Sequence, residues 1–289
     1  MTQSTQPPDA TRVSRERIGH AESLAAQRRW WDLEAVPYYA EHGAFLGDRN
    51  FVWGPEGWTE DELRLLAPAG LTPREPVLEI GSGAAQCARW LRNQGVAALA
   101  SDLSAGMLSR ARDIDGEHAD ALPLIQCDGA RLPFADASFG TVFTAYGVLP
   151  FVADSARVVR EVARVLVPGG RFVFSTTHPI RWVFPDEPGP AGLQAQQSYW
   201  DTRPYVERDH RGRVTYVEHH RTLGERIREI VAAGLVVSDL LEPTWPERNE
   251  QEWGGWSPLR GSVIPGTAIF VCDKPAVSDT PRASDTQQT

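Results

Sequence analysis

Lysine is nearly absent from this sequence. Lys274 is the only lysine among 289 residues, and arginine supplies every other basic side chain. A lysine nucleophile, a pyridoxal Schiff base and a Walker-type phosphate loop each need a lysine at the reacting site. Because Lys274 stands near the end of the chain and does not follow a glycine-rich turn, the sequence excludes these three chemistries.

Cysteine is scarce as well. Cys87, Cys127 and Cys272 are far apart in the sequence, and each stands among apolar neighbours. This pattern is typical of reduced thiols that are buried as small hydrophobic side chains. We therefore expect neither a disulfide nor a zinc site, and we predict a function that needs no metal.

Long apolar runs and an excess of positive charge are both missing. No stretch reaches the roughly 18 to 20 apolar residues of a membrane-spanning helix, and the first ten residues are polar, without the apolar core of a secretion signal. The net charge is −9, from 29 basic and 38 acidic residues, and so acidic a surface repels phosphate backbones. We expect a cytoplasmic protein that binds neither membranes nor nucleic acids.

The rest of the composition is typical of a globular protein, with 42% hydrophobic and 23% charged residues. Residues 1–14 and 275–289 are polar and carry too little apolar surface to offset the entropy of ordering, so we predict two disordered tails. The remaining residues, 15–274, are predicted to form one domain.

Short apolar runs alternate with helical patterns in the middle of the chain. Predicted strands cover residues 76–80, 96–100, 122–127, 141–145 and 171–175, and predicted helices cover 84–93, 104–113 and 154–166. Such βαβ alternation requires right-handed crossovers and a parallel sheet that is covered on both faces. The predicted fold class is therefore α/β, a doubly wound Rossmann-like sheet.

Two aromatic-rich segments flank this alternation. Residues 15–70 have a helical pattern and are predicted to form an N-terminal helical cap. Residues 177–222 are predicted to form an inserted lid, with strands at 205–209 and 213–219. Aromatic side chains in both segments are consistent with ordinary core packing or with a partly apolar substrate chamber.

Capping boxes mark two helix starts outside the alternating region. Thr59 is followed by Glu62, and Thr222 is followed by Glu225. Two further strands are predicted at 236–241 and 268–271, after the second of these helices.

A glycine turn follows the first predicted strand. In the sequence 77–83, Glu79 precedes Gly81 and Gly83, and glycines at such a turn let the backbone approach a ligand while helix amides face it. A dinucleotide site requires a third glycine or alanine where this chain has Gln86, so the pattern argues against NAD.

Acidic residues follow the next two strands. Asp102 stands 21 residues beyond Gly81, where a carboxylate can accept both hydroxyls of a ribose. It is also placed to cap a helix, although Ser104 is the better candidate for that role. Asp128 can accept a hydrogen bond from an adenine amino group, or it can be an ordinary turn residue before Gly129.

Taken together, these motifs resemble the class I S-adenosylmethionine-dependent methyltransferases, in particular the small-molecule methyltransferases of bacteria. The resemblance covers about residues 56–175 and rests on five linked motifs, at 77–83, 101–108, 128–130, 132–139 and 166–170. It implies a seven-stranded sheet whose last strand is antiparallel, and S-adenosyl-L-methionine as cofactor. The positions that it implies for cofactor binding are Glu79, Gly81, Gly83, Asp102, Leu103, Met107, Asp128, Gly129, Ala130, Ala145 and Tyr146.

The segment 145–150 limits the classes of molecule that can accept the methyl group. It lacks the Asn/Asp-Pro-Pro-Tyr/Phe motif of amino-directed nucleic-acid and protein enzymes of this fold, and Cys127 is on the wrong strand for the nucleophile of cytosine-5 enzymes. We therefore predict methyl transfer to an oxygen or nitrogen atom of a small-molecule metabolite. RNA or protein as acceptor and a non-catalytic cofactor-binding module remain the alternatives, and the oligomeric state stays open.

A hydroxyl acceptor needs a base, and histidine is the side chain that titrates near neutrality. His178 follows the fifth predicted strand directly, at the carboxyl edge of the sheet, and His220 stands on the apolar side of the predicted hairpin, with His219 on the other side. We name His178 as the first candidate for a catalytic base and His220 as the second. A structural role is the alternative for each.

Overall fold

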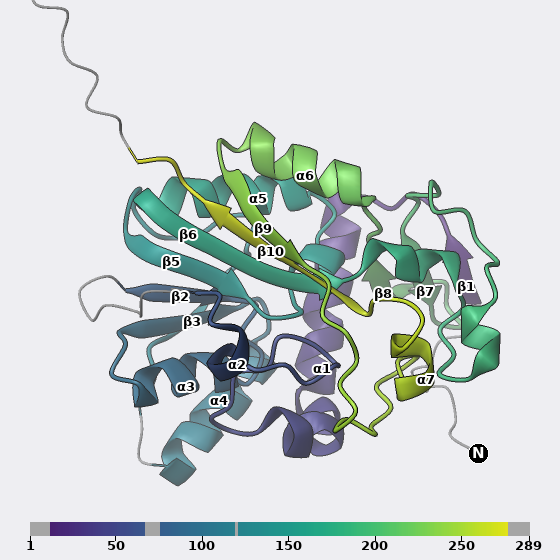
Figure 1. Ribbon diagram of the computed structural model, residues 1–289, viewed down its shortest axis with the longest axis horizontal. Coiled ribbons are helices and arrows are strands. Elements are labelled where there is room, and N and C mark those ends of the chain that lie inside the picture. Colours follow the sequence, from purple (N-terminus) through teal and green to yellow (C-terminus); the bar gives the residue numbers. More distant parts are fainter. Residues whose placement is uncertain (1–11, 67–75, 119–120, 277–289) are drawn as a thin grey trace, which may run out of the picture.

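A seven-stranded sheet forms the centre of the protein (Figure 1). The computed structural model describes residues 12–66, 76–118 and 121–276. The strand order is β4-β3-β2-β5-β6-β10-β9, and β10 is antiparallel to both of its neighbours. The predicted doubly wound sheet with its antiparallel last strand is therefore confirmed. The strands are β2 (Val77–Ile80), β3 (Ala98–Asp102), β4 (Leu124–Gln126), β5 (Phe139–Thr144), β6 (Leu166–Thr177), β9 (Val236–Leu241) and β10 (Thr267–Asp273).

Helices cover both faces of this sheet, as parallel strands require. In Figure 1, α3 (Gln86–Asn93) and α4 (Ala105–His118) lie on one side, and α5 (Ser155–Val165) and α6 (Leu223–Ala232) lie on the other. Side chains along β2 point alternately to the two faces of the sheet. Leu78 belongs to the core under α5, whereas Val77 belongs to the core under α3. Glu79 is thereby turned toward α3.

Local capping signals are borne out. Both capping boxes form, at α2 (Glu60–Leu63) and at α6. The Ser104 hydroxyl accepts a hydrogen bond from the Met107 amide at 3.0 Å, so Ser104 caps α4 as the sequence indicates. Cys87 and Cys272 are buried as expected, but Cys127 is only partly buried.

A second sheet of three strands has the order β1-β7-β8. It contains β1 (Arg12–Arg15), β7 (Tyr205–Arg208) and β8 (Val214–Glu218). The predicted tail 1–14 is therefore wrong at its end, because residues 12–14 pair with β7 in an antiparallel ladder. Residues 1–11 and 277–289 of the predicted tails lie outside the described part of the chain.

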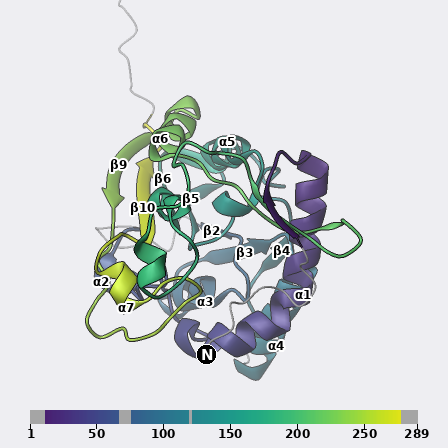
Figure 2. The ribbon, with the colours of Figure 1, turned by 90° about the vertical axis from the view of Figure 1, so that its right-hand side faces the viewer.

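Helix α1 (His20–Leu46) lies along the free edge of this small sheet. The Arg29 guanidinium donates to the backbone oxygen of Val214 at 2.7 Å, and the Gln27 amide donates to that of Val217. These side chains satisfy carbonyl groups that an edge strand would otherwise leave unpaired. Figures 1 and 2 place α1 and the small sheet at the same end of the large sheet, the end at which its parallel strands finish.

Candidate functional site

The turn after β2 uses glycine for two different reasons. Gly81 has φ +65°, and a Cβ there would overlap the side chain of Val148. Gly83 has φ +54°, but a Cβ there would meet nothing within 4 Å. Gly81 is therefore needed for close packing inside the protein, whereas Gly83 faces open space above the turn.

Asp102 connects this turn to the end of β3. Its Oδ2 accepts a hydrogen bond from the Gly83 amide at 2.8 Å, and its Oδ1 accepts one from the Ser104 amide at 2.8 Å. Burial raises the pKa of the Asp102 carboxyl to about 6, and the two amides act against this rise. The predicted helix-capping alternative is thus partly real, since Asp102 and Ser104 both act at the start of α4.

Glu79 is directed into the protein. Its Oε2 accepts a hydrogen bond from the Ala88 amide at 2.9 Å, in the first turn of α3, where backbone amides lack helical partners. Burial raises the pKa of the Glu79 carboxyl to about 8. In this arrangement Glu79 fixes α3 relative to the glycine turn.

The turn after β4 lies close to the glycine turn. Asp128 Oδ1 accepts a hydrogen bond from the Ala130 amide at 2.9 Å, as an ordinary turn residue does. A Cβ at Gly129 would lie 3.2 Å from Val148, the same side chain that restricts Gly81. Val148 thus fills the space between the two glycines.

Backbone strain marks the segment after β5. Tyr146 has φ +58° and Val148 has φ +49°, values that are uncommon for tyrosine and more so for a β-branched residue. The Tyr146 amide donates to Ser175 Oγ at 2.7 Å, which holds this segment against β6. Such strain gathers at functional sites. Ala145, Leu103 and Met107 lie beside the same edge of the sheet, the first two partly buried and Met107 buried.

His178 is committed to structural hydrogen bonds. Its Nδ1 accepts a hydrogen bond from the Ile180 amide at 3.1 Å, at the start of η2 (Pro179–Val183), and its Nε2 lies 2.7 Å from Glu242 Oε1. Because Nδ1 is an acceptor, the proton of the neutral ring is on Nε2 and points to the carboxylate. No lone pair remains for a substrate proton in this arrangement, which argues against His178 as the base, and a catalytic role of His178 stays a prediction.

His220 keeps one nitrogen free. Its Nε2 donates to the backbone oxygen of Tyr199 at 2.7 Å, whereas its buried Nδ1 has no hydrogen-bond partner within the described part of the chain. Burial lowers the pKa of the ring, so the neutral form is favoured. His219, by contrast, lies 3.0 Å from Ser23 of α1, and burial lowers its pKa to about 4.

Two buried or hydrogen-bonded acidic residues near the site, Asp32 and Glu56, were not predicted from the sequence. Asp32 of α1 accepts hydrogen bonds from the Ser104 hydroxyl at 2.7 Å and from the Gly106 amide at 3.0 Å. Glu56 is buried beside β10, where its Oε2 accepts a hydrogen bond from Thr267 at 2.6 Å. Burial raises the pKa of the Glu56 carboxyl to about 7. Neither residue is part of a recognisable motif, because distant elements create both environments.

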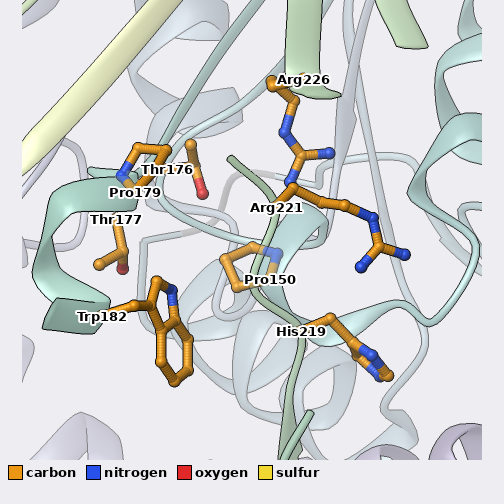
Figure 3. A pocket seen from close by; sticks show the side chains of 8 residues that line it. All are labelled: Pro150, Thr176, Thr177, Pro179, Trp182, His219, Arg221 and Arg226. Carbon is orange, nitrogen blue, oxygen red and sulfur yellow. The ribbon is translucent and has the colours of Figure 1, made fainter. Parts of the chain in front are cut away.

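The pocket in Figure 3 is too small for an organic ligand. Its volume is about 10 Å³, room for about one water molecule. Eight residues line it, namely Pro150, Thr176, Thr177, Pro179, Trp182, His219, Arg221 and Arg226. A larger pocket of about 360 Å³ is lined by Phe45, Glu56, Gly57 and the segment 248–251.

The residues at the carboxyl edge fit S-adenosylmethionine. Gly83 leaves open space over the start of α3, and the buried hydroxyl groups of Ser82 and Thr144 have no hydrogen-bond partner among the described residues. Buried polar atoms without partners are rare in proteins and are often explained by a missing ligand or water. Among the same residues, no group of three His, Cys, Asp or Glu side chains is placed to hold a metal ion, and no helix is long and apolar enough to cross a bilayer.

Residues 78–174 match a family that is described as a methyltransferase domain. The chain is 40% identical over 113 residues to the demethylmenaquinone methyltransferase of Mycobacterium sp. (strain JLS), and 39% identical over 105 residues to that of Corynebacterium urealyticum. These matches cover 38% and 36% of this chain, and 46% and 43% of the relatives. The chain therefore matches less than half the length of these relatives.

Solved structures are similar over more of the chain. An S-adenosylmethionine-dependent methyltransferase from Mesorhizobium loti has a TM-score of 0.55 and 25% identity, over 76% of this chain and all of that one. The 1,6-didemethyltoxoflavin-N1-methyltransferase of Burkholderia thailandensis has a TM-score of 0.57 and 14% identity, over 94% of this chain and 97% of that one, and at this identity it supports the fold alone.

Fold, glycine turn and relatives agree. The hydrogen bond from the Gly83 amide to the Asp102 carboxylate lies within the match over 78–174, and the antiparallel β10 completes the seven-stranded order beyond that match. The cofactor of this domain is S-adenosylmethionine. Residues 78–174 match a methyltransferase domain, and the chain has the fold of the class I S-adenosylmethionine-dependent methyltransferases.

Proposed function

We propose that this protein transfers a methyl group from S-adenosylmethionine to an oxygen or nitrogen atom of a small-molecule metabolite, without a metal. The observation that carries the proposal is the hydrogen bond from the Gly83 amide to Asp102, because it sets a carboxylate beside a glycine turn that faces open space. Relatives that are named demethylmenaquinone methyltransferases support a small acceptor.

Named residues would hold the cofactor. Asp102 would accept hydrogen bonds from the ribose and Asp128 from the adenine amino group, while Gly81 and Gly83 would let the backbone approach. Leu103, Met107, Gly129, Ala130, Ala145 and Tyr146 would line the same site. Glu79 would act indirectly, by fixing α3.

The cofactor supplies an activated methyl group on a sulfonium when it is bound. The protein then has to hold the acceptor in line, exclude water and, for a hydroxyl acceptor, remove a proton. His220 is suited to the last task, because its Nε2 proton is held by Tyr199 and its Nδ1 is free to accept. Residues 177–222 and α1 would cover the site as a lid and a cap.

Calorimetry with S-adenosylhomocysteine tests the cofactor site. Asp102→Ala should weaken binding at least about tenfold, or about 1.4 kcal/mol, because charge-assisted hydrogen bonds are lost. Asp113→Ala removes an exposed carboxylate from α4 and serves as the control. Equal affinities of the wild type and Asp102→Ala would refute the assignment.

Labelled S-adenosylmethionine tests the class of acceptor. The protein is incubated with a bacterial extract that has been divided by size into metabolites, RNA and protein. We expect label in the metabolite fraction. Label confined to RNA or to protein would favour the second enzyme class, and cofactor binding without any transfer would favour a non-catalytic module.

A further inference from the structure

One face of the small sheet carries tyrosine and glutamate in a checkerboard. Tyr205 and Glu207 alternate along β7, and Tyr216 and Glu218 alternate along β8. In the antiparallel register Tyr205 lies opposite Glu218, and Glu207 lies opposite Tyr216. The other face carries valines that pack on Ala26 of α1. The polar side chains are thus concentrated on one face.

Each tyrosine donates to the glutamate on its own strand. The Tyr205 hydroxyl lies 2.7 Å from Glu207 Oε1, and the Tyr216 hydroxyl donates to Glu218 Oε1. Burial raises the pKa of both tyrosines, so both hydroxyl groups stay protonated as donors. The arrangement leaves each carboxylate with a second oxygen to satisfy.

Glu218 and Glu207 differ in how this second oxygen is satisfied. Glu218 Oε2 lies 3.3 Å from the Arg181 guanidinium. Glu207 is only 5% exposed, and its Oε2 has no hydrogen-bond partner among the residues that the structure describes. Burial and the nearby Glu218 both raise the pKa of Glu207. A buried carboxylate oxygen without a donor is costly, so Glu207 calls for a donor from outside the chain.

The neighbouring cations are already engaged. Arg181 is also 3.2 Å from Asp186, and the guanidinium groups of Arg181 and Arg15 lie 4.7 Å and 4.3 Å from the ring centre of Trp182. Neither arginine is therefore available to Glu207. We therefore expect a ligand to supply the hydrogen-bond donor for Glu207 Oε2.

Aromatic rings stand beside the carboxylates. Tyr216 lies 4.9 Å from Trp30 and 6.2 Å from Phe151, between ring centres, and Phe151 lies 5.4 Å from Trp31. These rings come from α1, from η1 (Leu149–Phe151) and from β8. They provide an apolar wall next to an acidic group, a combination that suits an amphipathic cation.

This face adjoins the carboxyl edge of the large sheet. The His219 amide, one residue after β8, donates to the backbone oxygen of Pro150 at 2.7 Å. The Tyr146 hydroxyl is near enough to Glu218 and Arg181 for both to affect its pKa. The His220 ring, whose Nδ1 has no hydrogen-bond partner among the described residues, lies 5.7 Å from that of Trp182, between ring centres.

We propose that Glu207 is the anchor of the acceptor site, and that it binds a protonated amine on a small molecule whose apolar or aromatic body packs against Trp30, Phe151 and Tyr216. The proposal rests on the proposed function, because it supplies the acceptor for that methyl transfer. The amine is the group that is bound, and the methylated atom is elsewhere on the same molecule.

The test compares amines with neutral molecules of the same shape. Tryptamine, tyramine and phenethylamine are paired with tryptophol, tyrosol and 2-phenylethanol, and binding to the full-length protein is measured by calorimetry at saturating S-adenosylhomocysteine. We expect at least one amine to bind at least tenfold more tightly than its alcohol. Glu207→Gln, which keeps the shape and the acceptor for Tyr205, should remove that preference.

Two controls distinguish loss of the amine anchor from misfolding and from failure of the proposed function. Glu187→Gln removes an exposed carboxylate from the same inserted segment and should leave the preference unchanged. Glu207→Gln should raise the melting temperature, because a buried charge without a cation is lost, and should not alter the affinity for S-adenosylhomocysteine. Failure of the wild type to bind S-adenosylhomocysteine would refute the proposed function itself.

The anchor proposal is overturned by three results. The first is that no amine binds the wild type while S-adenosylhomocysteine does. The second is that amines and alcohols bind equally. The third is that Glu207→Gln retains the preference for amines.

Discussion

Asp32 on the N-terminal helix accepts a hydrogen bond from the hydroxyl of Ser104 at 2.7 Å. Ser104 also donates its amide to Asp102, so a single residue joins α1 to the carboxylate that we propose for the ribose. The same Asp32 oxygen accepts the Gly106 amide in the first turn of α4. Helix α1 is thereby hydrogen-bonded to the start of α4, beside the carboxylate that we propose for the ribose, rather than only packed near it.

Removing the hydrogen bonds of Asp32 should lower both the stability of the protein and its affinity for the cofactor product. Asp32→Ala deletes two hydrogen bonds, and we expect the free energy of unfolding to fall by about 1 kcal/mol and the affinity for S-adenosylhomocysteine to fall several-fold. Asp32→Asn keeps an oxygen acceptor and should retain most of both. Urea unfolding and calorimetry provide the measurements, with Glu41→Ala, an exposed change on α1, as control. An Asp32→Ala protein that binds like the wild type would show that the cap does not influence the cofactor site.

Gly81 and Gly83 form a matched pair for substitution by alanine. Gly81→Ala adds both an overlap with Val148 and a left-handed alanine, so we expect a loss of about 3 kcal/mol in the free energy of unfolding. Gly83→Ala meets no neighbour and should cost only about 1 kcal/mol.

At Gly83, substitution by alanine should affect cofactor binding much more than folding. Its new methyl group would point into the open space that we assign to the cofactor, so Gly83→Ala should fold yet bind S-adenosylhomocysteine at least about tenfold less tightly. Thermal unfolding and calorimetry are measured on the same samples. Wild-type affinity of a folded Gly83→Ala protein would mean that the cofactor does not approach this turn.

Glu79 should make stability depend on pH. Burial raises its pKa to about 8, whereas an unfolded glutamate titrates near 4.5. The native state therefore binds the proton more tightly, and the contribution of this group to stability is complete below pH 4.5 and is lost as the pH rises to 8.

Glu79→Gln removes this titration and keeps an acceptor for the Ala88 amide. The free energy of unfolding in urea should be similar for both proteins at pH 4.5, and at pH 8.5 the variant should be more stable by at least about 1.4 kcal/mol, the equivalent of one pKa unit. Asp102 and Glu56 also have raised pKa values, but they are present in both proteins and cancel in the comparison. Identical pH profiles would contradict the burial of a Glu79 charge.

What the sequence predicted well is what local pattern controls. Buried parallel strands need continuous apolar runs and helix starts need capping side chains, so the large sheet and the caps at Thr59, Ser104 and Thr222 could be read directly. Strand β1 could not, because Arg12–Arg15 is polar and forms a strand only through pairing with β7. Its partner strand is created by the inserted segment.

The site shows the same division. The glycine turn and Asp102 belong to two neighbouring motifs that can be recognised in the sequence. By contrast, His178 contacts Glu242, which is 64 residues away, and Glu56 contacts Thr267, which is 211 residues away. No spacing rule reports such contacts. A histidine after a strand therefore looks the same in sequence whether its lone pairs are free or committed.

The two histidines give the last prediction. His178→Ala should lower the melting temperature and leave the rate of methyl transfer at saturating cofactor nearly unchanged, because both ring nitrogens serve the structure. His220→Ala should lower the rate about 100-fold for a hydroxyl acceptor, since general bases contribute roughly 10² to 10⁴ in rate.

The pH profile separates a base from a positioning residue. Burial lowers the pKa of His220, so the wild-type rate should stay constant from pH 9 down to about 6.5, the ordinary value, and fall only at lower pH. If His220 is the general base, the rate of the His220→Ala variant should rise partly toward the wild-type rate as the pH approaches 9. The reason is that the hydroxyl group of the substrate then loses its proton more readily without a base. A merely positioning role gives a constant ratio between the two proteins. Wild-type rates in both variants from pH 6 to 9 would refute the general-base proposal. A neutral amine as methyl acceptor would also refute it, because no proton has to be removed from such an amine before the methyl group is transferred.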